Sequence, residues 1–111
     1  MRILDLGCGR GINLDFFNVG DGTVYGVDVS HASLSGAVVK FPHRKFCSGS
    51  GEALPFRDGS MDEVVSKVAL LYMNIPHARH EIHRVLVPVG TVSASLHYFR
   101  SLFLNCAAIR D

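Results

Sequence analysis

Cysteine is scarce in this sequence, and the few cysteines are far apart. Cys8, Cys47 and Cys106 form an odd set without a Cys-x-x-Cys pair. Neither a disulfide framework nor a zinc site is therefore indicated. Because free thiols persist in a reducing environment, we expect the protein to be cytoplasmic.

The sequence also lacks an excess of charge and a long apolar run. Eleven Lys and Arg residues stand against ten Asp and Glu residues, which gives a formal net charge of +1. A domain that binds nucleic acid usually carries a basic face, so no nucleic-acid partner is indicated. No segment approaches the ~18 unbroken apolar residues of a membrane-spanning helix. The first residues lack the basic-then-apolar order of a signal peptide.

Apolar residues, by contrast, are plentiful enough for one core. They make up 48% of the 111 residues, and charged residues make up 19%. This balance excludes a disordered chain. The length suits one small domain rather than two, and no linker, repeat or low-complexity stretch divides it. We therefore expect a single domain over residues 1–111.

Short apolar runs alternate with longer amphipathic segments along the chain. Strands are predicted over 2–6, 23–29, 44–48, 62–68 and 91–98. Helices are predicted over 12–19, 30–41 and 77–86, with a further helix beginning in the apolar tail 99–109. Ser30 is the expected N-cap of the second helix. Apolar strands joined by helices indicate a parallel sheet covered on both faces. We predict a three-layer α/β domain with a mainly parallel five-stranded sheet.

A glycine-rich turn, Asp5-Leu6-Gly7-Cys8-Gly9-Arg10-Gly11, follows the first predicted strand and precedes the first predicted helix. Glycines let the backbone approach a ligand, and a helix N-terminus presents free N–H groups. Asp28 ends the second predicted strand, where a carboxylate can accept both hydrogen bonds of a ribose diol. The spacing indicates a nucleotide site, and the alternative is an ordinary glycine turn with a capping Asp.

Two kinds of nucleotide are compatible with such a turn. The dinucleotide pattern Gly-x-Gly-x-x-Gly needs its third glycine at position 12, which is Ile12, whereas this sequence has Gly11. Asp5, inside the first strand, needs a donor or a cationic partner if it is buried. An ammonium group on the ligand meets that need. A ligand with an ammonium, a ribose and an adenine therefore fits better than a pyrophosphate, and Ile12 disfavours a nicotinamide-dependent oxidoreductase.

Four segments in unbroken order resemble the motifs of class I S-adenosylmethionine (SAM) dependent methyltransferases of the small-molecule type. They are residues 3–11, 24–30, 51–62 and 81–90. The resemblance covers residues 2–97. It implies a Rossmann-like methyltransferase core with the strand order 3-2-1-4-5, SAM as the cofactor, and methyl transfer to an acceptor, for which we expect a small molecule.

The resemblance also implies which residues hold the cofactor. Those around its methionine part would be Asp5, Gly7, Cys8, Gly9 and Gly11, with Cys8 packing as a small residue rather than reacting. Those around its adenosine part would be Asp28 for the ribose, Val29 against the adenine, and Ser50, Gly51, Glu52 and Ala53 at the adenine edge. Ser66 and Lys67 would face the methionine end, and Tyr72 and Asn74 would border the substrate.

The chain departs from the family's pattern in several places. Ser50 stands where the family often has an Asp that reads the adenine amino group, and Val89 stands where it usually has Gly. The family's helices before the first strand and its last two strands, one of them antiparallel, are expected to be missing. The rival interpretation is accordingly a non-catalytic remnant that binds SAM or a nucleoside, or an interaction module.

The sequence assigns no catalytic residue and no metal. Methyl transfer is an in-line displacement that depends mainly on alignment, and it needs a general base only for an acceptor of high pKa. His77, His80 and His83 drift around a helix without a cluster of further ligands, which favours a solvated face over a metal site. Lys67 either points to solvent or pairs with Asp5.

The end of the chain carries the last expectation. A sheet that ends at strand 91–98 would leave an exposed edge, with an apolar tail beside it. We therefore expect either a homodimer through that strand and the tail, or a fragment of a longer methyltransferase.

Overall fold

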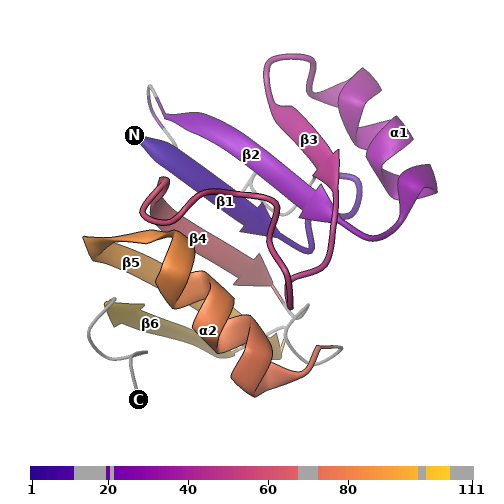
Figure 1. Cartoon of the computed structure of the whole chain (residues 1–111). Coiled ribbons are helices and arrows are strands. Elements are labelled where there is room, and N and C mark those ends of the chain that lie inside the picture. Colours follow the sequence, from indigo (N-terminus) through magenta and orange to yellow (C-terminus); the bar gives the residue numbers. More distant parts are fainter. Residues whose placement is uncertain (12–19, 21, 68–72, 98–99, 106–111) are drawn as a thin grey trace.

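The computed structural model describes the chain apart from residues 12–19, 21, 68–72, 98–99 and 106–111 (Figure 1). Its elements are β1 (Arg2–Leu6), β2 (Thr23–Asp28), α1 (His31–Lys40), β3 (Lys45–Ser48), β4 (Met61–Lys67), α2 (Ile75–Val85), β5 (Leu86–His97) and β6 (Arg100–Asn105). The first predicted helix, 12–19, lies outside the described residues. None of the described helices is long and apolar enough to cross a membrane.

The strands form a six-stranded sheet in the order β3-β2-β1-β4-β5-β6. All pairs from β3 to β5 are parallel, and β6 runs antiparallel to β5. The predicted order of the first five strands is confirmed. The strand order reverses at β1, because β2 and β3 lie on one side of it and β4 and β5 lie on the other. Open α/β sheets bind ligands at such a point, beyond the carboxyl ends of the strands.

The two faces of β1 carry different side chains because successive strand residues point to opposite faces. Leu4 and Leu6 pack in the main core with residues of α2, including Ile82. Ile3 joins Val24 and Val65 of the neighbouring strands on the other face. The sheet is therefore apolar on both faces, as its uninterrupted apolar strands predicted.

Both described helices begin at side-chain caps. Ser30 Oγ accepts a hydrogen bond from Ser33 N at 3.2 Å at the start of α1, so the predicted cap is confirmed. Asn74 Oδ1 accepts from His77 N at 3.2 Å at the start of α2. Such caps satisfy N–H groups that have no partner within the helix.

The prediction for the tail was wrong. Residues 100–105 form the antiparallel strand β6 rather than the start of a helix. Apolar residues alone do not distinguish the two, and the unpaired hydrogen-bonding groups of β5 favour a strand there. An antiparallel strand was also expected to be missing, and one is present. The predicted exposed edge at strand five is corrected as well, since β5 pairs with β4 on one side and β6 on the other.

The fifth strand begins earlier than predicted, at Leu86, directly after α2. Its pairing with β4 passes from Met61–Leu86 to Glu63–Thr91, so residues 87–90 form an irregularity rather than a separate turn. Val89 lies in this irregular stretch and is 88% exposed, which explains why a side chain is tolerated there.

Candidate functional site

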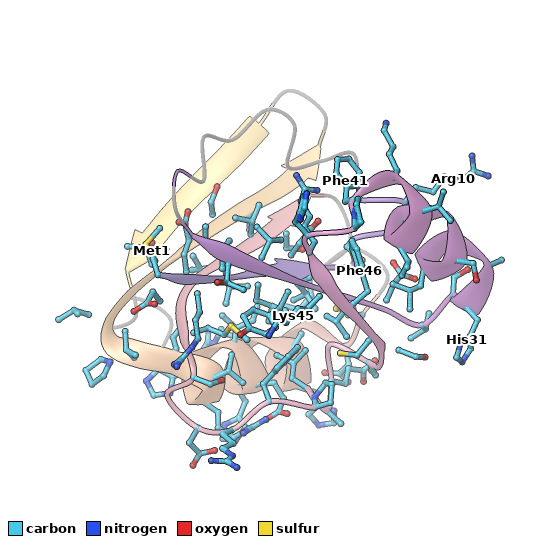
Figure 2. All side chains as sticks on the ribbon, turned by 90° about the horizontal axis from the view of Figure 1, so that it is seen from above. Met1, Arg10, His31, Phe41, Lys45 and Phe46 are labelled. Carbon is cyan, nitrogen blue, oxygen red and sulfur yellow. The ribbon has the colours of Figure 1, made fainter. Side chains whose placement is uncertain are left out.

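The carboxyl ends of the parallel strands β1, β2 and β4 lie side by side at one end of the sheet, called here the carboxyl edge. Most of the predicted site residues lie along it: Asp5, Gly7, Cys8, Gly9, Gly11, Asp28, Val29, Ser50, Gly51, Glu52, Ala53 and Ser66. Arg10, Phe41 and Phe46 lie at the end of the molecule that carries α1, and Met1 lies at the opposite end (Figure 2).

The glycine loop after β1 is a tight turn held against β2. The N–H groups of Gly7 and Cys8 both donate to Val27 O, at 2.9 and 3.0 Å. Gly9 and Gly11 adopt φ angles of +53° and +85°, which favour glycine. A Cβ on Gly9 would meet nothing within 4 Å, whereas one on Gly11 would lie 3.0 Å from the Phe41 ring. The loop therefore leaves open space at Gly9, as a ligand site requires.

Asp28 joins this loop to the start of α1. Its Oδ2 accepts a hydrogen bond from Gly9 N and its Oδ1 accepts one from Ser30 N, both at 2.9 Å. Each carboxylate oxygen can accept a second hydrogen bond. Asp28 can therefore bind a ribose diol while it holds the glycine loop, a structural role that sequence reasoning missed.

Asp5 is a buried acid on the face of the sheet that carries Ile3. The side chain is 1% exposed, and its Oδ1 has no hydrogen-bond partner among the described residues. Burial raises the pKa of Asp5 to about 7, and the nearby charge of Asp28 adds to this, while Arg44 acts in the opposite direction. A buried oxygen without a partner is costly, so this position favours a donor or a cation from a ligand.

Ser66 supplies a second buried polar atom at the end of β4. Its side chain is 1% exposed, and its Oγ also lacks a hydrogen-bond partner within the described chain. Ser66 pairs with Leu6 and therefore lies on the α2 face, opposite Asp5. Lys67 is the last residue of β4, and its side chain lies outside the described part of the structure.

The loop after β3, residues 49–60, carries the predicted adenine edge. Gly49 N donates to Asp28 O at 3.0 Å, which places the start of the loop at the end of β2. Ser50 Oγ accepts from Glu52 N at 3.1 Å, and Ala53 N donates to Ser50 O at 3.1 Å. Ser50 therefore stabilises its own turn and keeps a hydroxyl proton to donate.

Gly51 holds this loop against the end of β1. Its backbone is buried, and a Cβ there would lie 2.5 Å from Met73 Sδ and 3.1 Å from Leu6 Cδ1. This close approach brings the turn at Ser50 beside the glycine loop.

Val29 is 72% exposed directly beyond Asp28, so an apolar surface is available for a flat base.

The predicted substrate-border residues have separate outcomes. Tyr72 lies outside the described residues. Asn74 is exposed and caps α2 through its Oδ1, a role that sequence reasoning did not foresee. His77 Nδ1 lies 3.8 Å from Glu52 Oε1, so the start of α2 and the loop after β3 are neighbours.

Arg44 is a residue that sequence reasoning missed. Its guanidinium lies 3.9 Å from the centroid of the Phe41 ring, and its Nη1 donates to Gly11 O at 2.7 Å. The stacked guanidinium therefore fixes the far end of the glycine loop. No local pattern marks it, because residues 11 and 44 meet only in the folded sheet.

The structure supports a packing role for Cys8. Its side chain is 1% exposed, and burial raises the pKa of the Cys8 thiol to about 12, so the thiol stays protonated. Among the described residues, no group of three or more His, Cys, Asp or Glu side chains could hold a metal ion.

The carboxyl edge offers three features that suit a cationic nucleoside ligand. The unpartnered Asp5 suits an ammonium group, the two oxygens of Asp28 suit a diol, and exposed Val29 suits a base. Gly9, whose N–H binds Asp28, leaves open space in the glycine loop. The residues present therefore fit SAM.

Comparison with known families gives the same result. Residues 4–94 match the family model described as "Methyltransferase domain". The chain belongs to this methyltransferase family. The resemblance seen in the four motifs is thereby confirmed, and SAM is the cofactor that goes with the family.

Individual relatives show how far the likeness extends. The chain is 36% identical over 92 residues to an uncharacterized methyltransferase of Synechocystis, covering 80% of this chain and 43% of the relative. It is 30% identical over 107 residues to human arginine-hydroxylase NDUFAF5, covering 94% of this chain and 31% of the relative. The crystal structure of YcgJ from Bacillus subtilis superposes with a TM-score of 0.77 at 27% identity, covering 84% of this chain and 42% of that one. The chain thus spans less than half the length of these proteins.

Proposed function

We propose that this chain binds SAM at the carboxyl edge and transfers its methyl group to a small-molecule acceptor. The observation that carries the proposal is the buried Asp5, whose Oδ1 has no partner in the described structure, beside the open glycine loop. SAM supplies a methyl group on a sulfonium, which is already activated for displacement.

Different residues of the site would bind different parts of the cofactor. The glycine loop and Asp5 would hold the methionine half, with Ser66 and Lys67 at its end. Asp28 would accept the ribose hydroxyls, and Val29 would cover the adenine. The turn from Ser50 to Ala53 would form the adenine edge. The contacts of Asp28 and Gly51 support this division, since they bring the glycine loop and the turn together.

The chain's contribution to catalysis would be alignment of the reacting groups. In-line displacement needs the nucleophile, the methyl carbon and the sulfur held in a line. The hydrogen bonds by which Asp28, Arg44 and Val27 fix the glycine loop support this role. Tyr72 and Asn74 stay predictions as residues that border the acceptor, and no general base is assigned.

The non-catalytic remnant remains the second candidate. It is favoured by Ser50, which stands where the family often has an acid. A relative named arginine-hydroxylase also extends the possible reactions beyond methyl transfer.

A homodimer through the tail stays a prediction. Pairing of two copies through β5 has lost its basis, because β6 occupies that edge of β5.

Calorimetric titration with SAM, S-adenosylhomocysteine and a nicotinamide dinucleotide tests the proposal. We expect the first two to bind and the third not to bind. A turnover assay with SAM and a panel of small acceptors then separates an enzyme from a remnant. Binding without any turnover would favour the remnant, and binding of the dinucleotide alone would contradict both. The cytoplasmic setting is a separate prediction, tested by localisation of the tagged protein.

A further inference from the structure

The densest side-chain network in the described structure lies away from the glycine loop. Glu81 and Arg84, on α2, bind the loop that follows β3. Glu81 Oε1 accepts from Leu54 N at 2.7 Å, and Arg84 Nη2 donates to Leu54 O at 3.0 Å. Arg84 Nη1 donates to Phe56 O at 2.8 Å and to Asp58 Oδ1 at 2.8 Å. We call this pair of side chains the loop clamp.

The two charged side chains also bind each other. Arg84 Nε donates to Glu81 Oε2 at 2.6 Å, and Arg84 Nη2 donates to Glu81 Oε1 at 3.0 Å. This is the two-point geometry that makes an Arg–carboxylate pair strong and directional. Their side chains are 26% and 13% exposed, so water screens the pair only in part. The contact holds the pKa of Glu81 below its usual range.

The loop clamp replaces secondary structure at this point. Residues 54–58 belong to no helix or strand, yet Leu54 is buried and both of its backbone polar groups are bonded to the clamp. A buried backbone group without a partner would cost ~1–3 kcal/mol. The clamp itself stands on a rigid base, because Ile82 and Val85 anchor α2 in the main core. The position of the loop is thus set by α2.

The clamped segment leads directly into the turn at the carboxyl edge. Leu54 is the next residue after Ala53, whose N–H closes that turn onto Ser50 O. Gly51 lies against Leu6 and Met73, so the turn has little freedom to move once Leu54 is fixed. The loop clamp therefore fixes the position of the turn from Ser50 to Ala53 at the carboxyl edge.

We propose that Glu81 and Arg84 are positioning residues that set the affinity of the carboxyl edge for the nucleoside half of its ligand. The inference rests on the proposed function and deepens it. Neither residue touches the ligand. Each acts by holding the turn from Ser50 to Ala53, and the glycine loop and Asp5 do not depend on them.

The test uses Glu81→Gln and Arg84→Lys in the full 111-residue chain. Gln keeps the size and one acceptor but loses the charge and the second acceptor. Lys keeps the charge but cannot bond two carbonyls and two carboxylates at once. The matched control is Arg79→Lys, an exposed arginine on the same helix. Two probes are titrated by calorimetry: S-adenosylhomocysteine, and 5′-methylthioadenosine, which has no amino-acid group.

We expect both clamp variants to bind both probes about 5- to 30-fold more weakly, because the turn from Ser50 to Ala53 would then have to be ordered on binding. The ratio of the two dissociation constants should stay at the wild-type value. Asp5→Asn should change that ratio, since it weakens only the probe with an ammonium group. Arg79→Lys should match the wild type.

Hydrogen exchange separates a positioning role from a general loss of stability. In the clamp variants, the amides of residues 50–56 should exchange faster, while those of β1 and α2 keep their wild-type rates. Variants that bind both probes as the wild type does would overturn the inference and leave the proposed function standing. Faster exchange throughout the chain would overturn it as well. A wild-type chain that binds neither probe would overturn both.

Discussion

At the scale of single residues, the site is a set of groups whose hydrogen-bonding capacity is only partly used. Asp5 is buried with an unpartnered oxygen, whereas Asp28 uses both oxygens on backbone N–H groups and has further capacity. Ser50 uses its oxygen within its own turn. The three residues were predicted together, but the structure gives each a different local role, and each role has its own test.

Asp5→Asn should stabilise the protein at alkaline pH. The pKa of Asp5 is about 7 in the fold against an ordinary value of 3.8, because burial disfavours the charged form. The folded chain therefore holds a proton that the unfolded chain releases, and this group's contribution to stability falls as pH rises from about 4 to 7. Above pH 7 the penalty is complete, at roughly 1–4 kcal/mol. Urea unfolding at pH 5 and pH 8 measures it.

The Asn variant should lose less stability than the wild type between these two pH values. The control is Glu63→Gln on β4, a carboxylate that is only half-buried. Parallel changes in the wild type and Asp5→Asn would show that Asp5 is not the titrating group.

Asp28→Ala should weaken binding of S-adenosylhomocysteine by ~1.5–3 kcal/mol, the range for hydrogen bonds to a charged group. The reason is that the diol loses its acceptors and Gly9 N loses its anchor. Calorimetry gives the change in affinity. Ser30→Ala is the control, because it removes the cap of α1, costs ~0.5–2 kcal/mol of stability, and should leave the affinity unchanged. Equal affinity of Asp28→Ala and wild type would remove Asp28 from the site.

Ser50→Asp should tighten binding of adenine nucleosides. An Asp side chain can accept from Glu52 N as Ser50 Oγ does, and it adds a charged acceptor for the adenine amino group. We expect an affinity gain of about 5-fold or more, measured with 5′-methylthioadenosine. The inosine analogue, which lacks the amino group, should show no gain. A folded variant with equal or weaker binding of both analogues would place Ser50 away from the adenine.

At the scale of elements, strand ends and helix starts do most of the positioning. The glycine loop, the end of β2 and the start of α1 share Asp28, and the loop after β3 is held by α2. The sixth strand belongs to the same scale. It covers the edge of β5 and satisfies hydrogen-bonding groups that would otherwise attract another chain.

Removing β6 should make the protein associate. A chain ending after residue 97 would expose the outer edge of β5 over its whole paired length, from Thr91 to His97. Sedimentation at several concentrations should show oligomers of the shortened chain, together with a lower thermal transition. A shortened chain that remains monomeric at all concentrations would show that the β5 edge is protected by other means.

At the scale of the whole molecule, the two faces of the sheet have different roles. One face of β1 builds the main core with α2, and the other carries Asp5 at the carboxyl edge. The reversal of strand order at β1 places the site between β2 and β4, where open α/β sheets bind their ligands. Fold and site therefore follow from the same topology.

The sequence by itself determined the first five strands, the cap at Ser30 and the positions of the glycine loop and Asp28. These depend on local periodicity, on turn residues and on spacing within a short stretch of chain. The resemblance of four segments determined the family and, with it, the order of those strands in the sheet. The sequence misassigned the tail because an apolar run fits a helix or a strand equally well until its neighbours are known.

Only the tertiary structure decided which distant groups meet. Arg44 reaches Gly11, and Glu81 and Arg84 reach Leu54 and Phe56, through contacts that no local pattern encodes. The second role of Asp28, in holding Gly9, likewise required β1 and β2 to be side by side. β6 became a strand because β5 offered a free row of hydrogen-bonding groups. Contacts of this kind depend on the packing of the whole chain, and that packing is what converts a recognisable motif into a site of defined shape.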